Sequence, residues 1–470
     1  MRVRSRAIAV IAAPVLTAAW LLSGYLSAGA APPAPPHGIA AKPIPAGYHF
    51  PTKTAVIDGW VKTNNAAAIR AHSWDIWAGM TSNSGETYNG AALPIWETWF
   101  GSEEIFPAPG ATAPTSLTAL AATRTAPSRK FIVPHQFAHD RAALLGALAD
   151  QGPPSVRVVS FNKFDPDAAG FIVAPHPGPQ SKTYHYNTAA QLTALNNAWP
   201  TISNGQQRGL ADFPNPAIET KPVMSLVKAT GLTPLPIWQG PGNATNQKNP
   251  TPNTWKACIL IDPAEAAGSP IVKATAAQIA TLPAKTGLAC TTYLYGPLSL
   301  LYAFKMSAAE ATAFNNAQGA GAAAGDYAVL SAMHVNSKET TNWTWQTFYW
   351  QPGGDTPNGF PGSKQNQPAN VVTPWNNYAM CSNYNQTATF GGTTMDVCFN
   401  PYLETSKSIP AGITSNCMSC HGTARINPAN PNQPYPTAYT APISFFHDGT
   451  YFNRSTTHTD FSWAVPDDAQ

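Results

Sequence analysis

Two cysteines and a histidine near the end of this 470-residue chain have the spacing of a cofactor attachment site. They lie in the run CMSCH, as Cys417, Cys420 and His421. Cys-x-x-Cys-His is the sequence that attaches c-type haem. Two thiols three positions apart near a helical turn can add to the two vinyl groups of one porphyrin. The adjacent histidine then projects toward the iron as the proximal ligand.

Three other interpretations of this run compete with haem attachment. A thioredoxin-like redox pair also uses Cys-x-x-Cys, but in a βαβ unit that is not evident here. A zinc site needs ligands beyond two cysteines and one histidine, and the chain has no second Cys-x-x-Cys. A disulfide that closes so tight a loop is usually strained. Covalent haem attachment occurs outside the cytoplasm, so the start of the chain decides among these interpretations.

The first thirty residues have the pattern of a cleavable export signal. Three arginines precede an apolar run over residues 7–26, and Ala28-Gly29-Ala30 offers the small residues that a signal peptidase needs. An uncleaved membrane anchor is the alternative, because the apolar run is almost long enough to span a bilayer. Pro14 and the cleavage pattern favour a signal peptide. We therefore expect a periplasmic protein that contacts the membrane only through its N-terminus, if the signal stays uncleaved.

The composition excludes two broad classes of protein. Without residues 1–30, the chain has 24 basic and 24 acidic residues, so its net charge falls from +3 to zero. A neutral chain is a poor nucleic-acid binder, because neutralisation of phosphates dominates that affinity. Proline accounts for 46 residues, which shortens helices and argues against a long-helix bundle. We expect no nucleic-acid partner.

With this motif behind an export signal, the chain resembles the monohaem c-type cytochromes, most specifically over residues 417–422. The resemblance implies one covalent haem c, thioether bonds from Cys417 and Cys420, and His421 as an axial iron ligand. Residues 96–99 and 334–348 are similar to segments of large exported cytochromes with one C-terminal haem. This broader resemblance implies no known reaction.

The second axial ligand departs from the pattern of small cytochromes, which supply a methionine downstream of the motif. Here 49 residues follow His421 and none of them is methionine. His334 is the first candidate distal ligand, because it opens the segment similar to large exported cytochromes. His447 is the second, since two preceding phenylalanines could deliver it to an apolar pocket. We expect a histidine or an open position in preference to methionine.

Four further cysteines lie outside the motif. An even number of cysteines in an oxidising compartment favours disulfides, and four allow three connectivities. Proximity in the sequence favours Cys258–Cys290 and Cys381–Cys398, and buried free thiols are the alternative. The second bridge would staple a loop just before the motif.

Two other groups of titratable residues could do chemistry. His135 and His139 have the i, i+4 spacing of metal ligands, but the zinc-protease glutamate is missing. Glu97, Glu103 and Glu104 stand among aromatic residues, either as acids and bases or as rim charges over a packed core.

The elements predicted from local patterns are short and mixed. Helices are expected at 54–79, 137–150, 187–199 and 307–318, and strands at 156–161, 222–227, 257–261, 326–335 and 343–350. The expected fold class is α+β, a loop-rich and proline-rich mixed domain followed by a small, partly helical cytochrome c-like haem segment. The predicted parts are the signal peptide 1–30, a Pro/Ala-rich linker 31–50, a mixed α/β domain 51–375 of unknown role and a haem-binding region 376–470.

Two classes of function are compatible with these features. The first is a periplasmic electron-transfer protein that exchanges single electrons with unknown redox partner proteins. The second is a haem c-dependent oxidase, peroxidase or dehydrogenase with its substrate site upstream, because the upstream domain is far larger than one haem needs. A haem-based ligand-binding module is a further alternative. The sequence identifies no catalytic residue and no substrate.

Overall fold

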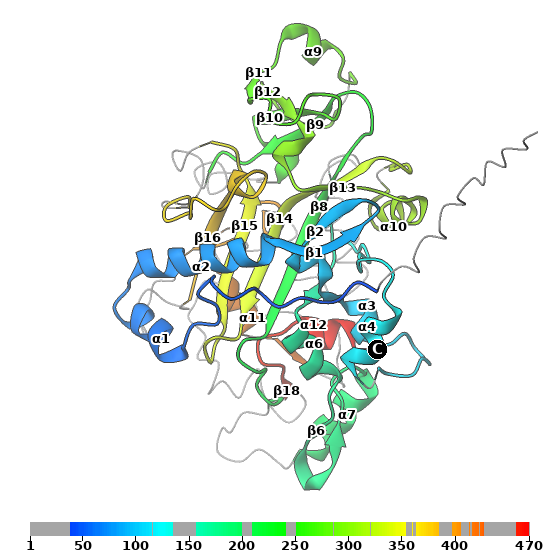
Figure 1. The fold of residues 1–470 in the computed structure, drawn as a ribbon, viewed down its shortest axis with the longest axis vertical. Helices are drawn as coiled ribbons and strands as arrows, with labels where there is room; N and C mark the ends of the chain where they lie inside the picture. The colour runs from blue at the N-terminus through cyan, green and yellow to red at the C-terminus, as the bar shows by residue number, and fades with distance from the viewer. Residues whose placement is uncertain are drawn as a thin grey trace, which may run out of the picture. The chain divides into compact units, whose positions relative to one another are not determined.

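A computed structural model describes residues 38–114, 116–134, 157–199, 209–240, 251–284, 286–319, 321–353, 360, 363–384, 397–405, 413, 416–422, 424–426 and 457–469. Residues 38–470 form one compact unit. Helices, strands and many loops are mixed within it (Figure 1), which confirms the predicted α+β fold class.

The central element is an eight-stranded sheet in which all paired strands run antiparallel. Its order is β16 (Tyr378–Ser382), β15 (Thr344–Trp350), β14 (Tyr327–Ser337), β8 (Ile218–Val227), β5 (Lys163–Phe164) and β3 (Phe100–Gly101). At its sides, β13 (Ala303–Lys305) pairs with β14, and β4 (Val159–Ser160) pairs with β8. Every residue of β15 is buried, so this strand is covered on both faces.

Smaller elements surround this sheet. A mixed four-stranded sheet contains β11 (Val272–Lys273), β12 (Thr292–Pro297), β10 (Ala257–Asp262) and β9 (Thr233–Ile237). Two-stranded sheets pair β1 (Asn83–Tyr88) with β2 (Ala91–Pro94), β6 (His176–Pro177) with β7 (Thr183–Tyr184), and β17 (Arg425–Ile426) with β18 (Thr457–His458). The helices are α1 (Thr54–Lys62), α2 (Ala66–Thr81), α3 (Ser102–Ile105), α4 (Leu117–Thr123), α6 (Pro166–Val173), α7 (Ala189–Ala198), α9 (Ala276–Ala280), α10 (Ala308–Gln318), α11 (Cys417–His421) and α12 (Ala464–Asp468). None of the helices in the described part of the chain is long and apolar enough to cross a membrane.

Most of the elements predicted from local patterns are present. Ser307 caps α10 in a capping box with Glu310, as its position predicts. The helix expected over 54–79 is instead two helices, because Asn64 has a positive φ of 50° and Asn65 caps α2. The strands expected at 222–227, 257–261, 326–335 and 343–350 correspond to β8, β10, β14 and β15. Only β4 forms within 156–161, and residues 137–150 lie outside the described residues.

Alternation along the central strands gives the sheet two different faces. Cross-strand partners point to the same face, so Met333, Phe348 and Met380 form one row. Helix α2 lies across this face (Figure 1), with the Trp77 ring stacked on the Phe348 ring at a centroid distance of 4.1 Å. The residues on either side of these along each strand point to the opposite face, where Tyr349 and Cys381 pack in one core with Phe399 and Leu403 of the C-terminal part of the chain.

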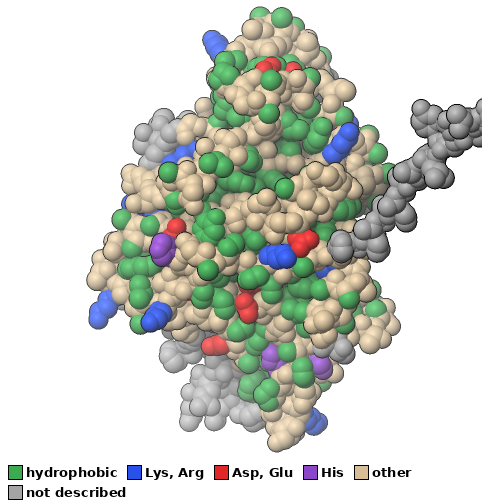
Figure 2. Space-filling model, in the orientation of Figure 1, with side chains coloured by type: hydrophobic (Ala, Val, Ile, Leu, Met, Phe, Trp, Pro, Cys, Tyr) green, Lys and Arg blue, Asp and Glu red, His purple; other side chains and the backbone are tan. Residues whose placement is uncertain are grey.

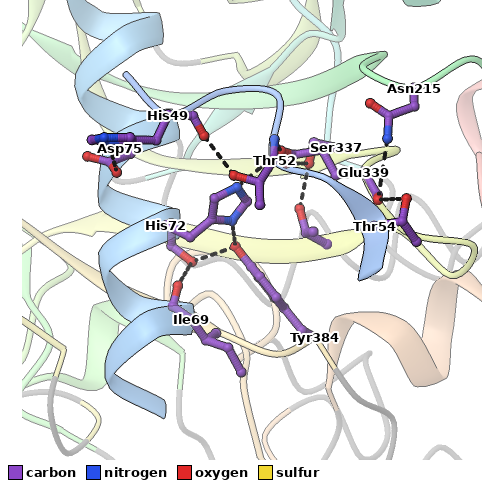
Figure 3. Close-up of polar contacts among 12 residues, drawn as sticks. His49, Thr52, Thr54, Ile69, His72, Asp75, Asn215, Ser337, Glu339 and Tyr384 are labelled. Atoms are coloured by element: carbon purple, nitrogen blue, oxygen red, sulfur yellow. Dashed lines mark hydrogen bonds and ion pairs between the residues drawn. The ribbon is translucent and has the colours of Figure 1, made fainter. Parts of the chain in front are cut away.

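A buried polar cluster holds the end of β14 against α2 (Figure 3). The Glu339 carboxylate, fully buried, accepts bonds from Ser337 Oγ, from the Thr52 amide and from His72 Nε2 at 3.1 Å. The other ring nitrogen of His72 lies 2.7 Å from the Tyr384 hydroxyl. Each polar group named here has a partner, as buried polar groups require. Because Glu339 lies in the turn between β14 and β15, these contacts fix that turn.

The visible surface carries few charges. On the face drawn in Figure 2, Lys, Arg, Asp and Glu side chains are scattered and form no patch of one sign. This distribution matches a chain in which only 11% of residues are charged.

Substitutions at the Trp77–Phe348 contact test the packing between α2 and the sheet directly. Replacing Phe348 with Ala should lower the free energy of unfolding by about 3–5 kcal/mol, because a fully buried ring is lost and a cavity remains. Phe348→Leu, which retains much of the volume, should cost less than half as much. Denaturant unfolding followed by near-UV circular dichroism measures both, and an equal effect of the two variants would contradict this role of the ring.

Candidate functional site

The short helix α11 places both motif cysteines on one side and buries Met418 on the other. Cys417 and Cys420 are three positions apart, so they share a helical face with the following His421. Met418 is 1% exposed and packs in a core with Trp345 and Phe461. The helix also contacts β15. The fold therefore fixes the direction in which the two thiols and the imidazole point.

The two thiols and the imidazole line one pocket together with residues from the central sheet. Its free volume is about 30 Å³, enough for one or two waters and well below the roughly 300–1,000 Å³ of small-molecule sites. Its walls include Cys417, Cys420, His421, Trp345, His334 and Glu404. The predicted proximal and distal histidines thus line the same cavity, although 87 residues of sequence separate them.

His421 is held as a neutral imidazole with one nitrogen engaged. Its Nδ1 lies 2.8 Å from the Phe461 carbonyl oxygen, which can only accept, so Nδ1 carries the hydrogen. Burial lowers the pKa of His421 to about 4, so the ring is neutral at physiological pH. The lone pair of Nε2 is then available to a metal. Metal-binding histidines commonly have this arrangement, because a bond from the other nitrogen fixes the tautomer and raises ligand basicity.

The thiols of Cys417 and Cys420 are reduced and protonated. Neither forms a disulfide, and desolvation raises the pKa of both, with a further contribution from the Glu404 carboxylate. A redox-active Cys-x-x-Cys pair requires a lowered thiol pKa, because the thiolate is the attacking species. This environment therefore disfavours the thioredoxin-like interpretation of the motif.

His334 projects from β14 on the face opposite to α2. It shares a row with Thr347 and Cys381, and its Nε2 lies 3.0 Å from Glu404 Oε1. The Trp345 ring packs against His421, with centroids 4.4 Å apart.

The segment 397–405 forms a wall of the pocket and is anchored to the sheet at three points. The Asn400 side chain donates to Thr347 Oγ1 at 2.7 Å, and Glu404 bonds to His334 as described. Cys398 and Cys381 lie at disulfide distance, with Cα atoms 5.7 Å apart. A β-bridge from Cys398 to Asn416 then links this wall to the residue before the motif.

The two predicted cysteine pairings are both present. Cys258 pairs with Cys290 in the same way, with Cα atoms 5.8 Å apart, between β10 and the residues before β12. Only the Cys381–Cys398 pair adjoins the pocket.

The three glutamates do not form an acid–base site. Glu97 is fully buried and pairs with Arg129 at 3.1 Å, so it lies inside the core and not at its rim. Glu104 pairs with Arg124 at 2.8 Å, and Glu103 accepts a bond from Ser128. Arginines thus compensate the charges of Glu97 and Glu104, and Glu103 has a hydroxyl partner.

Several other residues singled out in the sequence lie elsewhere. His447, His135 and His139 lie outside the described residues. Among the described residues, no methionine lines the pocket, and no three His, Cys, Asp or Glu side chains form a group that could hold a metal ion.

Two residues of the site carry no recognisable sequence signal. Glu404 belongs to no motif, and the role of Phe461 depends on its backbone carbonyl, which every residue has. Only the fold brings them to the two histidines.

No protein-family model, curated protein or solved structure matches this chain. The assignment of the site therefore depends on its own chemistry. A neutral imidazole whose Nε2 lone pair is available and two protonated thiols on the same helical face fit covalent attachment of haem, whereas the adjacent pocket of about 30 Å³ is too small to enclose a porphyrin.

The Cys381–Cys398 bridge should control access to the two motif thiols. In haem-free protein made in an oxidising compartment, we expect Cys381→Ala with Cys398→Ala to speed labelling of Cys417 and Cys420. The rate of thiol labelling should rise about tenfold for each 1.4 kcal/mol of local stability that the pocket wall loses.

Removing Cys258 and Cys290 provides the matched control. Each bridge should stabilise the fold by about 3–4 kcal/mol in the chain-entropy account, because the loops span 17 and 32 residues. The control should therefore lower global stability without selectively speeding thiol labelling under native conditions. Equal labelling rates in the two double variants would contradict a local role for Cys381–Cys398.

Proposed function

We propose that this chain is an exported c-type cytochrome that carries one covalently attached haem and transfers single electrons. The observation that carries the proposal is the engagement of His421 Nδ1 by the Phe461 carbonyl beside two protonated thiols that form no disulfide. Haem c supplies one-electron Fe(III)/Fe(II) chemistry when it is bound. The protein's part is to hold the group, to set its ligands and to exclude water.

Each residue of the motif has a separate role in this proposal. Cys417 and Cys420 would add across the two vinyl double bonds. Each addition would form a carbon–sulfur bond and place the thiol hydrogen on the neighbouring carbon, so it would need no oxidant. His421 would bind the iron through Nε2 while Nδ1 keeps its bond to Phe461. The low pKa of His421 favours this role, since a neutral imidazole is the ligand form.

Export and a redox partner belong to the same proposal. Residues 1–30 would act as a signal peptide that delivers the chain to the periplasm, where haem is attached. The partner would be a redox protein that docks near the haem. These points depend on the sequence, because residues 1–37 lie outside the described part of the chain.

The distal position has two candidate states. His334 would act as the second axial ligand if it exchanges its bond with Glu404 for the iron. If the 3.0 Å bond between His334 and Glu404 persists, the sixth position stays open. An open position would favour the alternative functions, a haem c-dependent oxidoreductase or a ligand-binding module.

The first test is covalent attachment. Protein from a maturation-competent periplasm should keep its haem after denaturation, gain the mass of one haem and undergo reversible one-electron reduction. Cys417→Ser with Cys420→Ser should abolish all three, whereas Cys258→Ser with Cys290→Ser should preserve the haem. Haem-free wild-type protein from such a host would refute the proposal.

The second test concerns the distal ligand. Near-infrared magnetic circular dichroism of the ferric protein should show a bis-histidine signature, and His334→Ala should convert it to a high-spin form that added imidazole restores. His49→Ala changes an exposed histidine and should have no effect. A methionine charge-transfer band would exclude histidine, and a bis-histidine signature that survives His334→Ala would move the assignment to His447.

A further inference from the structure

The carbonyl that engages His421 belongs to a turn with unusual backbone angles. Asp460 and Phe461 have φ values of 48° and 66°, and neither is glycine. The Ser462 amide donates to the Thr459 carbonyl at 3.0 Å, so residues 459–462 form a β-turn with positive φ at both central positions. Such turns strongly prefer Asn-Gly, because other residues adopt these angles at a cost.

Buried side chains hold this turn in place. Asp460 Oδ1 lies 2.6 Å from Lys338 Nζ, and the two side chains are only 3% and 5% exposed. Asp460 Oδ2 accepts a bond from the Phe213 amide at 2.8 Å. The Thr459 amide donates to the Ala424 carbonyl at 3.1 Å, which ties the turn to the residue just before β17.

We propose that the Lys338–Asp460 ion pair is a positioning device for the proximal histidine: it holds residues 460 and 461 in the left-handed conformation and so keeps the Phe461 carbonyl on His421 Nδ1. This inference rests on the proposed function, because it concerns the ligand of the attached haem. Strain of this kind persists only where the surroundings over-determine it, and it is concentrated at functional sites.

The Phe461 side chain explains why the turn does not use glycine. The ring is 1% exposed and packs near Trp345, which itself contacts His421. The ring therefore anchors the turn in the core while the carbonyl of the same residue engages the imidazole. A glycine would adopt the backbone angles freely but would lose this anchor.

Strand β14 links the two sides of the pocket. Lys338 directly follows β14, and its amide donates to the Ala217 carbonyl at 2.8 Å. His334 lies four residues earlier on the same strand. The candidate distal ligand and the lysine that positions the proximal side therefore share one rigid element.

The test replaces Lys338 and measures the reduction potential of the haem as well as the stability of the fold. Donation from Nδ1–H raises the basicity of the ligand and favours the ferric state, so loss of this bond should raise the reduction potential. We expect Lys338→Met to change the one-electron equilibrium about tenfold, which is about 59 mV, with haem stoichiometry unchanged. Lys338→Met with Asp460→Asn should return the potential toward the wild-type value, because Asn tolerates positive φ and leaves no buried charge.

A matched control separates positioning from general destabilisation. Arg129→Met breaks the buried pair with Glu97 and should destabilise the fold without moving the potential. Should Lys338→Met yield no holo-protein, Asp460→Asn alone supplies the same test, because it keeps an acceptor for the Phe213 amide but weakens the ion pair. A haem-loaded single variant, Lys338→Met or Asp460→Asn, with the wild-type potential would overturn the inference.

Failure of the proposed function would be recognised separately, by haem-free wild-type protein. The positioning role can then be tested in that protein by NMR of labelled histidine. Lys338→Met should shift His421 away from the Nδ1–H tautomer, and an unchanged tautomer population would overturn the inference.

Discussion

Burial of the central sheet on both faces is the constraint on which the rest of this structure depends. Strand β15 is buried at every position, so each face needs its own cover. Helix α2 supplies tryptophan side chains to one face, and Trp77 stacks directly on Phe348. The other face is covered by C-terminal segments, among them α11 and residues 397–405. The Cys-x-x-Cys-His motif therefore lies on the sheet as part of its core.

This placement sets the chemistry of the motif. Desolvation keeps the His421 imidazole neutral and the two thiols protonated, which are the forms that iron binding and thioether formation use. The same burial makes unpaired charges costly, so Lys338, Asp460 and Glu404 occur in specific pairs. Removing one member of such a pair would leave the other charge buried without a partner. Each pair therefore keeps its two side chains in place, and with them the geometry around both histidines.

Strand β14 organises the site more than the motif itself does. It carries His334 toward the pocket, it leads into Lys338, and its end is fixed by the cluster around Glu339 and His72 (Figure 3). The upstream region and the C-terminal region consequently share one core, in which Trp343 and Trp345 pack with Met418 and Phe461. The size of the upstream region is thus partly explained by its role as the scaffold of the pocket.

The sequence by itself determined the features that depend on local spacing, namely the motif at 417–421, the cap of α10 and the strand expected at 343–350, and it favoured the two cysteine pairs among three connectivities. Their physical cause lies within a few residues or, for the disulfides, in short loops of an even cysteine set. Tertiary structure alone decided which groups meet across long separations. The Phe461 carbonyl reaches His421 over 40 residues, Glu404 reaches His334 over 70, and Asp460 reaches Lys338 over 122. These contacts arise from strand register and from the left-handed turn at 460–461, and neither leaves a periodic pattern in the chain.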